Sequence, residues 1–497
     1  RGELMRTVPR DNEEVNECWL SDRDRYSHQG LYAEDRAAVP MLREGDAWRE
    51  ASWDEALAKA TQILRDNAAD DLGILAHPAT SNEEGALLAR LAQGLGTGNI
   101  DHRIGQVDPA GAGASEAFGM PVADISRADV IVIVGSNLRH EVPLLHQRVR
   151  QAWRKGARVH VVNPVDFDFT FDIEGKHIVA PSRIADALGS GELAGALRAG
   201  DRAAVIVGAL AESGPHAGAI RAAAASLAQS TGAALCRIPQ GANALGLANA
   251  GVLPASHDAR SMLEQARAAY VLYGIEPGLD FADQAQALNA LKGAQVVAFS
   301  QFACESTRAV ADVILPIGAL PEIDATLTNL DGREQHAVAG ARLPGEARPG
   351  WRVLRSLGAG LGLEGFGFVD IAGLRAGIQP VPRPLAEGQG SATNGGQGEA
   401  LELASAPAIY RSDAVVRRAA ALQAHPLTLG PQITLHPDDA QRIGVADQAM
   451  ARVSNHAGTA TIKVSVSASV APGAAWIERG YGASAALVAG RVEVQAA

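Results

Sequence analysis

Short apolar runs that alternate with alanine-rich helical stretches constrain the fold more than any other feature of this sequence. Strand-like runs lie at residues 73–76, 130–134, 159–162, 205–207, 235–238, 270–272, 296–299 and 313–315. Strands separated by helical patterns indicate parallel sheets with helices on both faces. We therefore predict an α/β fold built on parallel sheets.

Two of the helical stretches carry recognisable start signals. Ser52 with Glu55, and Ser81 with Glu84, have the spacing of a capping box. In this motif the serine and glutamate side chains satisfy backbone N–H groups that the first helical turn leaves free. We predict helices that begin just after Ser52 and just after Ser81.

The last part of the chain has a different pattern. Residues 379–400 are rich in Pro, Gly, Ser and Asn, which is typical of a linker or a draped loop. A helical pattern around 409–422 is followed by short β runs at 433–435, 451–453, 459–466 and 474–477. These runs predict a small C-terminal β domain, which we expect to be a barrel.

Length and charge narrow the class of protein. The chain has 497 residues, too many for a single hydrophobic core, and a formal net charge of −12. It has no long block of Lys and Arg, which argues against a nucleic-acid partner. Because no run of about 18 apolar residues is present, we expect no direct membrane insertion. The first residue is Arg1, and we expect the chain to begin inside a longer polypeptide.

Metal-binding patterns are absent from the sequence. Cys18, Cys236 and Cys304 are its only cysteines. Their number and separation fit a reducing compartment and exclude an iron–sulfur cluster held by four cysteines of this chain. The histidines are scattered, and none has the spacing of a zinc motif.

Two strand ends carry polar residues that could form a site. The run 313–315 is followed by Pro316, Glu322 and the turn 329–333, and the run 130–134 is followed by residues 135–137, Gly-Ser-Asn. Ligands of open α/β sheets bind beyond the carboxyl ends of the strands, where backbone N–H groups can hold an anion. An ordinary surface turn and a plain strand-to-helix turn remain alternatives, and the spacing alone favours them.

The same segments resemble the molybdopterin oxidoreductase family. The similarity covers the strand at 311–316 with its TN-x-x-GR loop at 328–333, the A-D-x-(apolar)-G-S-N segment at 128–137, the Asn-Pro break at 163–164 and the tail at 436–458. It implies a multidomain molybdopterin-oxidoreductase-like α/β fold with Rossmann-like parallel sheets and a small C-terminal β-barrel. It also implies pterin-cleft positions at Gly135, Ser136, Asn137, Asn163, Asn243, Glu322, Asn329, Gly332 and Arg333.

The sequence departs from the family at its metal-ligand positions. Aligned with the family's N-x-G-x-L-C-x-K-G pattern, residues 16–21 place Ser21 at the cluster cysteine. The cysteine or selenocysteine that binds the metal in formate-dehydrogenase-like members aligns with Val107. We therefore interpret the pterin-cleft positions as vestigial and expect no catalytic residues, no metal and no molybdopterin in this region.

One branch of the family shares these losses: the large iron–sulfur subunit (75 kDa type) of respiratory complex I, NADH-quinone oxidoreductase. The detailed similarity lies at residues 8–13, 16–17, 19–20, 22–25, 30–31 and 99–103. This resemblance implies a non-catalytic structural region that supports upstream electron-transfer modules holding 2Fe-2S and 4Fe-4S clusters. It further implies that the partners are other peripheral-arm subunits of complex I, at the cytoplasmic face of a bacterial inner membrane.

The resemblance suggests four units. We expect a remnant of an N-terminal iron–sulfur-type β module at 1–50, and a discontinuous α/β domain at 51–107 plus 209–425. A second Rossmann-like α/β domain would span 108–208, and a barrel-like domain 426–497.

Two other functions stay open. The first is an active molybdenum or tungsten bis-pterin oxidoreductase, formate-dehydrogenase-like, with Glu322 and His102 near the metal. In that case residues 135–137 and Asn243 would hold the pterin dinucleotide. The second is a soluble nucleotide-binding module.

Overall fold

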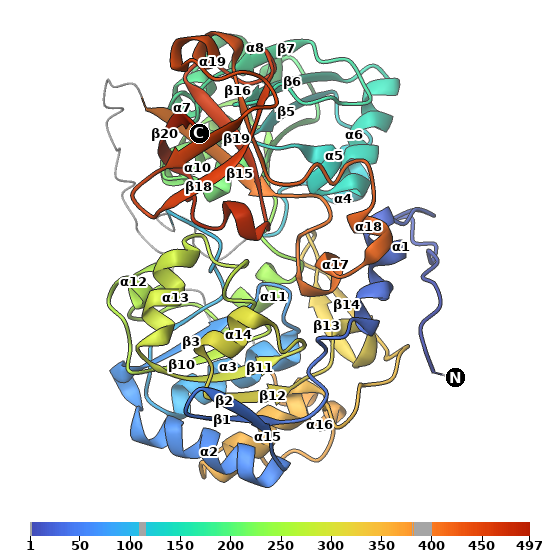
Figure 1. The fold of residues 1–497 in the computed structure, drawn as a ribbon. Helices are drawn as coiled ribbons and strands as arrows, with labels where there is room; N and C mark the ends of the chain where they lie inside the picture. The colour runs from blue at the N-terminus through green and yellow to red at the C-terminus, as the bar shows by residue number, and fades with distance from the viewer. Residues whose placement is uncertain (1, 109–115, 380, 382–399) are drawn as a thin grey trace.

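A mixed sheet of seven strands forms the larger α/β unit (Figure 1). The computed structural model describes residues 2–108, 116–379, 381 and 400–497. In spatial order the strands are β2 (Ala47–Glu50), β1 (Met41–Glu44), β12 (Val313–Pro316), β11 (Gln295–Ser300), β10 (Ala269–Tyr273), β3 (Leu72–Ala76) and β4 (Ile100–Asp101). The strands from β12 to β4 run parallel, while β1 and β2 form an antiparallel edge.

Helices cover both faces of this sheet, as the sequence predicts. One face packs against α2 (Trp53–Asp66), α3 (Asn82–Gly94), α15 (Gly350–Gly360) and α16 (Ile371–Ala376). The other packs against α12 (Ala259–Glu264), α13 (Gln284–Lys292) and α14 (Glu305–Val310). Both predicted capping boxes are present, at Ser52 with Glu55 and at Ser81 with Glu84.

A second, all-parallel sheet of five strands forms the smaller α/β unit. Its spatial order is β7 (Gly175–Ile178), β6 (Arg158–Asn163), β5 (Val130–Val134), β8 (Ala203–Val207) and β9 (Ala234–Arg237). Its two apolar faces are covered by α4 (Val122–Ile125), α5 (Leu138–Glu141) and α6 (Pro143–Arg154), and by α7 (Ile184–Leu188), α8 (Gly191–Arg198) and α10 (Ala217–Thr231). The central strand β5 is wholly buried, which explains its continuous apolar run.

The tail forms a closed six-stranded barrel. Around it the order is β15 (Leu401–Pro407), β19 (Ala474–Arg479), β16 (Gln432–Leu435), β18 (Thr459–Val466), β17 (Met450–Ser454) and β20 (Gly490–Ala496), with α19 (Pro437–Ile443) beside it. Buried and exposed residues alternate along most of β18, because successive side chains point to opposite sides of the barrel wall. The predicted fold class, parallel α/β sheets with a small C-terminal barrel, is confirmed.

Strand pairing differs from the expected domain boundaries in three places. The barrel includes β15, which lies before the expected start at 426. The five-stranded sheet extends to β9, beyond the expected end at 208, and β1 and β2 join the larger sheet although they fall within 1–50. Pairing between segments far apart in sequence leaves no local pattern, and the expected domain boundaries stay a prediction.

The predicted helix at 409–422 is in fact two short helices, α17 (Ala414–Arg417) and α18 (Ala420–Gln423). The Asp413 side chain accepts hydrogen bonds from the N–H groups of Val415 and Val416, so the first helix starts at this cap. Nearly all of the predicted linker at 379–400 lies outside the described residues.

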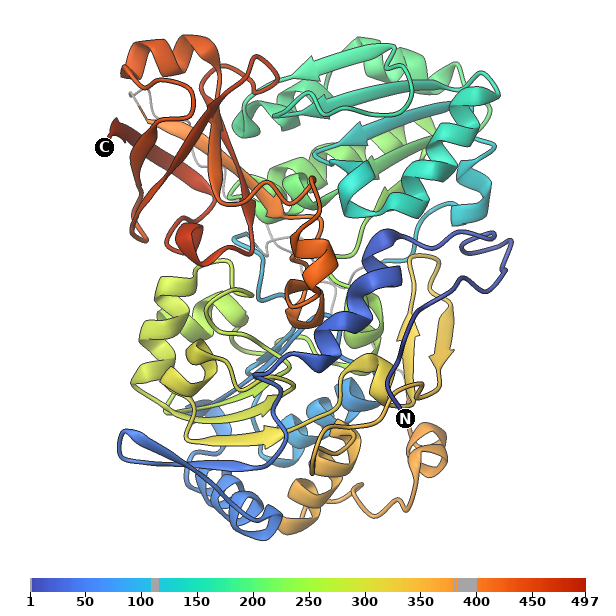
Figure 2. The ribbon, with the colours of Figure 1, turned by 45° about the vertical axis from the view of Figure 1, so that its right-hand side comes forward.

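The N-terminal segment lies along the side where the two α/β units meet. Figure 2 shows α1 (Asp22–Tyr26) and the 3-10 helix η1 (Ser27–Tyr32) next to α17 and α18. The hairpin β13 (Ala325–Thr328) and β14 (Glu334–Ala337) is nearby. No helix in the part of the chain that the structure describes is long and apolar enough to cross a membrane.

Shorter helices make up the remaining connections. They are η2 (Ala69–Asp71), η3 (Pro181–Arg183), α9 (Ala209–Ser213), α11 (Ala244–Ala250), η4 (Leu320–Glu322) and η5 (Gly482–Ser484). Of these, α9 and α11 start close to the ends of parallel strands β8 and β9, and they therefore help to shape the site.

Candidate functional site

A cavity of about 630 Å³ lies where the carboxyl ends of both parallel sheets face the barrel. From the larger sheet its wall includes His77, Gly274 and Gln301, each directly after a strand. The smaller sheet contributes Ile238, and the barrel contributes the end of β19. This is the position at which open α/β sheets bind ligands.

Residues 135, 136 and 163 form a hydrogen-bonded clip between β5 and β6. Gly135 has φ +54°, and a Cβ there would lie 2.5 Å from Ala211, so only glycine fits. The Ser136 N–H donates to Asn163 Oδ1 over 2.9 Å, and Asn163 Nδ2 donates to the Ser136 carbonyl over 3.1 Å. The Ser136 N–H that the sequence suggested for an anion is thus already used. None of these three residues lines the cavity, whereas the next residue, Asn137, does.

Asn243 ties three segments together. Its Nδ2 donates to the Thr80 carbonyl over 2.6 Å and to Asn82 Oδ1 over 2.9 Å. Its Oδ1 accepts from the Thr328 N–H over 2.7 Å. Asn243 is fully buried. Its hydrogen bonds join the start of α3, the start of α11 and the β13–β14 hairpin.

The TN-x-x-GR loop is a turn closed by its own asparagine. Asn329 Oδ1 accepts from the N–H groups of Asp331 and Arg333, each at 3.0 Å, and Gly332 has φ +75°. The exposed Arg333 forms an ion pair with Glu14 of the N-terminal segment. Only Asn329 of the three expected positions in this loop lines the cavity.

Glu322 is held by Arg36. Arg36 Nη1 donates to Glu322 Oε1 over 2.8 Å and Nη2 to Oε2 over 2.7 Å. The Ala319 N–H also donates to Glu322 Oε2 over 2.8 Å, and the Arg36 guanidinium stacks over Phe302, 5.2 Å from the ring centre. The carboxylate is therefore neutralised inside the protein and does not line the cavity.

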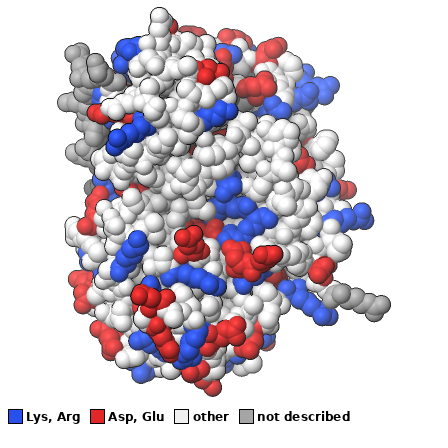
Figure 3. All heavy atoms as spheres, in the orientation of Figure 1, with Lys and Arg blue, Asp and Glu red and all other residues white. Residues whose placement is uncertain are grey.

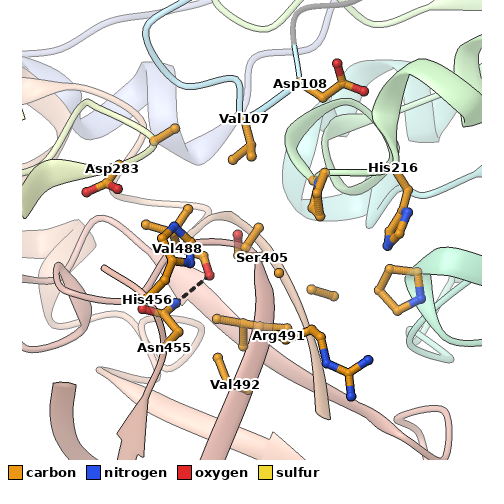
Figure 4. A pocket seen from close by; sticks show the side chains of 18 of the residues that line it. Val107, Asp108, His216, Asp283, Ser405, Asn455, His456, Val488, Arg491 and Val492 are labelled. Carbon is orange, nitrogen blue, oxygen red and sulfur yellow. Dashed lines mark hydrogen bonds between the residues drawn. The ribbon is translucent and has the colours of Figure 1, made fainter. Parts of the chain in front are cut away.

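Ser21 and Val107, the two expected ligand positions, lie in different surroundings. Ser21 caps α1, accepting from the Asp24 N–H over 3.2 Å and donating to Asp24 Oδ2 over 2.6 Å. Val107 points into a second cavity, of about 920 Å³, with Val488 and Val492 of the barrel side opposite (Figure 4). An alkyl side chain offers no donor atom to a metal.

Asp108, next to Val107, contacts the start of a helix of the smaller unit. Its Oδ2 accepts from the Gly218 N–H over 2.8 Å, at the start of α10. Elsewhere on the second cavity, the Asn455 side chain donates to the Val488 carbonyl over 2.9 Å (Figure 4). The polar groups around Val107 thus stabilise the local backbone.

Several ionisable groups on the first cavity have shifted pKa values. Burial raises the pKa of Glu141 to about 7, although hydrogen bonds from Ser136 and the Ala209 N–H oppose the shift. Burial also raises the pKa of Glu478 to about 7 and lowers that of His140 to about 4. His140 is therefore neutral at pH 7, whereas Glu141 and Glu478 change their charge near pH 7, as expected for desolvated side chains.

A buried ion-pair network, which the sequence analysis missed, lies next to the cavity. Arg417 donates to Glu276 Oε2 and Asp280 Oδ1, each at 2.8 Å, and Arg418 donates to Asp35 Oδ2 over 2.6 Å and Glu276 Oε1 over 2.5 Å. Burial disfavours the charged form of Glu276, but Arg417 and Arg418 outweigh this effect and lower its pKa to about 2. The consecutive arginines at 417–418 were the only signal in the sequence.

In the view of Figure 3, charged side chains are dense over the lower half of the molecule, around the larger sheet, and extend across its middle. The central part of the upper half, over the barrel, is mostly uncharged.

The ion-pair network around Glu276 lies in the interior, because the Arg417 side chain is only 4% exposed. It joins the N-terminal segment, the larger sheet and α17.

Comparison with known proteins identifies the family of this chain. A family model described as molybdopterin oxidoreductase matches residues 36–359. The chain belongs to the molybdopterin oxidoreductase family. A model for the molydopterin dinucleotide binding domain matches residues 403–495, and one for the NADH-ubiquinone oxidoreductase NDSU1/NuoG-like 4Fe-4S domain matches residues 1–29. The start of the dinucleotide binding domain at 403 agrees with the inclusion of β15 in the barrel.

Two curated relatives of this chain are named as subunits of NADH oxidoreductases. The chain is 28% identical over 392 residues to the mitochondrial NADH-ubiquinone oxidoreductase 78 kDa subunit of Neurospora crassa, covering 75% of this chain and 50% of that protein. It is 29% identical over 372 residues to a subunit of the NADH-quinone oxidoreductase of Rickettsia felis, covering 73% and 53%. The chain thus spans about half the length of the curated relatives it matches.

A solved structure shares the whole fold. Acetylene hydratase from Pelobacter acetylenicus matches with a TM-score of 0.70 and 14% identity, over 96% of this chain and 94% of that one. At this identity the likeness concerns the fold alone. The predicted molybdopterin-oxidoreductase-like fold is confirmed by these comparisons.

Proposed function

We propose that this chain is a non-catalytic structural region of the large iron–sulfur subunit of NADH-quinone oxidoreductase, complex I. The observation that carries the proposal is the order of matches: a NuoG-like 4Fe-4S domain at 1–29, then the molybdopterin oxidoreductase model. The relatives from Neurospora crassa and Rickettsia felis, both named as parts of such an oxidoreductase, support it. The role would be to hold electron-transfer modules in place.

The geometry of the cleft supports a structural role. A molybdenum-bound pterin is the cofactor that the family name implies, and the cysteine or selenocysteine that binds the metal in formate-dehydrogenase-like members aligns with Val107. Among the described residues, no three His, Cys, Asp or Glu side chains gather in a way that could hold a metal ion. Most of the expected pterin-cleft positions are engaged in hydrogen bonds or ion pairs within the protein, as described above. The residues present do not fit the metal-bound cofactor, and no catalytic step is assigned to them.

The partners follow from the proposed subunit. The iron–sulfur clusters, of 2Fe-2S and 4Fe-4S type, would lie in modules of the subunit beyond this region. Other peripheral-arm subunits of complex I would contact its surface, at the cytoplasmic face of a bacterial inner membrane. Because electron tunnelling depends on fixed distances between clusters, a rigid support is itself a contribution. The buried ties at Arg36, Asn243 and Arg417 are consistent with such rigidity.

The decisive experiment is the metal and pterin content of the purified, unproteolysed protein. We expect iron and acid-labile sulfide, and neither molybdenum, tungsten nor a pterin chromophore. Stoichiometric molybdenum or tungsten with a pterin would overturn the proposal and favour the formate-dehydrogenase-like alternative. Co-purification with complex I activity in the same preparation would support the assigned complex, whereas isolation as a free oxidoreductase would contradict it.

A further inference from the structure

Residues 2–20, which we call the arm, have no hydrophobic core of their own. The arm contains no helix or strand apart from an isolated bridge between Asn12 and Glu17, and none of its side chains is buried. Figure 2 shows it running past the β13–β14 hairpin toward the smaller α/β unit. Yet the 4Fe-4S domain model matches residues 1–29. The arm therefore resembles part of a domain whose core these residues do not supply.

The arm and the two short helices after it carry a concentration of exposed apolar side chains. Met5, Val8, Trp19, Tyr26 and Tyr32 are 40% to 77% exposed. No other stretch of this length in the described part of the chain has more than two large exposed apolar side chains. Such a concentration marks a surface that contacts another protein or another domain.

Hydrogen bonds fold the arm back on itself and onto the helices. The Leu4 N–H donates to the Tyr32 hydroxyl, which joins the start of the arm to the end of η1. Asn16 Nδ2 donates to the Arg10 carbonyl over 2.9 Å and to the Trp19 carbonyl over 3.0 Å, which joins the two sides of a turn. The exposed apolar side chains thus lie on one folded-back segment and not on separate loops.

Arg148 of α6 holds the turn of the arm at residues 12–17. Its Nη1 donates to Glu17 Oε1 and its Nη2 to the Glu13 carbonyl, each over 2.6 Å. Gln151, on the same helix, donates to Glu17 Oε2 over 2.9 Å. The Arg148 side chain is 7% exposed and that of Glu17 is 17% exposed. Both carboxylate oxygens of Glu17 are therefore fixed by one face of α6, largely shielded from solvent.

The backbone of the turn supports a single orientation. Glu17 has φ +52°, in the left-handed region that residues with a Cβ rarely adopt and that persists only where other contacts hold it. The Asn12 N–H donates to the Glu17 carbonyl over 2.8 Å, and the Glu17 N–H donates to the Asn12 carbonyl over 2.7 Å. The ion pair of Arg333 with Glu14 is exposed, and such surface pairs contribute little. Arg148 is therefore the main link between the turn and the body of the protein.

We propose that Arg148 is a positioning residue for the iron–sulfur module of this subunit. Through Glu17 and Glu13 it fixes the turn of the arm to α6, and the exposed apolar side of the arm packs against the rest of that module. The inference rests on the proposed function, which supplies the module. We assign the apolar surface to this module because the 4Fe-4S model includes the arm and the chain spans about half the length of its curated relatives.

Cys18, next to Glu17, is exposed in this chain and provides the probe. The intact, iron-loaded subunit is treated briefly with iodoacetamide without oxygen, both alone in dilute solution and within the assembled complex. The tryptic peptide of residues 11–23 contains Cys18 as its only cysteine, so mass spectrometry measures its alkylation separately from that of cluster ligands. Because the module covers the arm, we expect Cys18 to react at least about tenfold more slowly than in the guanidinium-unfolded subunit.

Arg148→Met tests the positioning residue, because it removes both bonds to the turn. We expect alkylation of Cys18 in the folded subunit to rise by at least about tenfold as the arm opens locally. A residue that only stabilised the fold would lower Tm without changing this alkylation below the unfolding transition. Glu17→Gly removes the carboxylate and suits the left-handed backbone, and it should raise the alkylation in a protein that folds.

Two further variants serve as controls. Glu17→Gln keeps an acceptor for Arg148 and should retain most of the protection of Cys18. Arg150→Met, on the same helix, should react like the parent, because Arg150 donates to the Thr170 carbonyl over 3.3 Å and not to the arm.

The inference is supported if Cys18 is protected in the isolated subunit and loses this protection in Arg148→Met and Glu17→Gly. Alkylation of the parent as fast as in the unfolded subunit would overturn it. Protection found only in the assembled complex, or only where the subunit dimerises, would also overturn it, because another subunit or a second copy would then cover the arm. Unchanged protection in both variants would show that Arg148 does not hold the turn. A preparation without iron would refute the proposed function, whereas any of these contrary results in an iron-loaded, active complex would refute this inference alone.

Discussion

Arg36 and Glu322 form a two-pronged ion pair, with donor–acceptor distances of 2.8 and 2.7 Å and side chains only 5% and 2% exposed. They lie 286 positions apart in the sequence. The pair connects the segment after η1 to η4, which follows β12. The loop that the resemblance predicts to face a cofactor therefore places Glu322 against Arg36 of the protein itself.

Glu322→Gln should destabilise the fold and leave electron transfer nearly unchanged. The amide can still accept one hydrogen bond, but the buried charge of Arg36 loses its partner, and we expect a loss of about 3 kcal/mol in the free energy of unfolding. Chemical denaturation measures this loss. The double change Arg36→Met with Glu322→Leu serves as the control and should recover much of it. NADH–quinone turnover per assembled complex should stay close to the parent value, and a large drop would contradict the scaffold role.

Ile314→Asp should prevent assembly. Ile314 is fully buried in β12, opposite Ala298 of β11 and Met41 of β1. An unpaired carboxylate in this apolar layer should cost more than about 4 kcal/mol. Ile314→Val, which removes one methylene, should cost only about 1 kcal/mol. The yield of assembled complex from cells carrying each variant is the measurement, and normal assembly of the Asp variant would refute the assignment of β12 as a central strand.

Local pattern predicted most of the strands of this fold, but it placed none at β4, β7, β13, β14, β15 and β20. The continuous apolar run of β5 and the alternating run of β18 were predicted as strands, and both are strands in the structure. Both could be predicted because the order of apolar and polar residues along a strand reflects whether one or both of its faces are buried. The capping boxes at Ser52 and Ser81 mark true helix starts for the same reason. Segment pairing was harder, and β9 and β15 joined sheets that no local pattern indicates.

The candidate site was less predictable, because its residues act through distant partners. Asn243 was expected to face a pterin, yet its side-chain amide is hydrogen-bonded to Thr80, Asn82 and Thr328. Glu276 had no distinguishing neighbour in the sequence, although it lies at the centre of the ion-pair network. Such contacts depend on the tertiary arrangement of three or more segments, which spacing along the chain does not encode.

Arg417→Met should destabilise the protein most at neutral pH. The change leaves Glu276 with Arg418 alone and Asp280 without its partner, a loss of about 3 to 5 kcal/mol.

The pH dependence gives a second readout of this network. The pKa of Glu276 is about 2 in the folded state, against 4.5 ordinarily. Its contribution to stability is therefore present above about 4.5 and is lost as the pH falls toward 2. Arg417→Met should flatten the fall in unfolding free energy over that window, measured by urea denaturation at a series of pH values. An unchanged acid profile would show that Arg417 does not hold Glu276 ionised. Arg127→Met, whose surface pair with Asp124 is largely exposed, should change neither stability nor profile.

Glu141→Gln should stabilise the protein above neutral pH. Burial raises the pKa of Glu141 from 4.5 to about 7, so the folded state binds more protons than the unfolded state between these values. Stability then falls as the pH rises from about 4.5 to 7 and stays low above 7. Removing the charge should raise the free energy of unfolding by up to about 3 kcal/mol above pH 7 and leave it unchanged below about pH 4.

Glu212→Gln is the matched control. This buried glutamate is held ionised by Arg237 and Arg221, and its replacement should destabilise the protein at pH 7. If denaturation curves show Glu141→Gln to be destabilising at pH 8, the carboxyl group is ionised and paired in the folded state, and the cavity wall carries a negative charge at neutral pH.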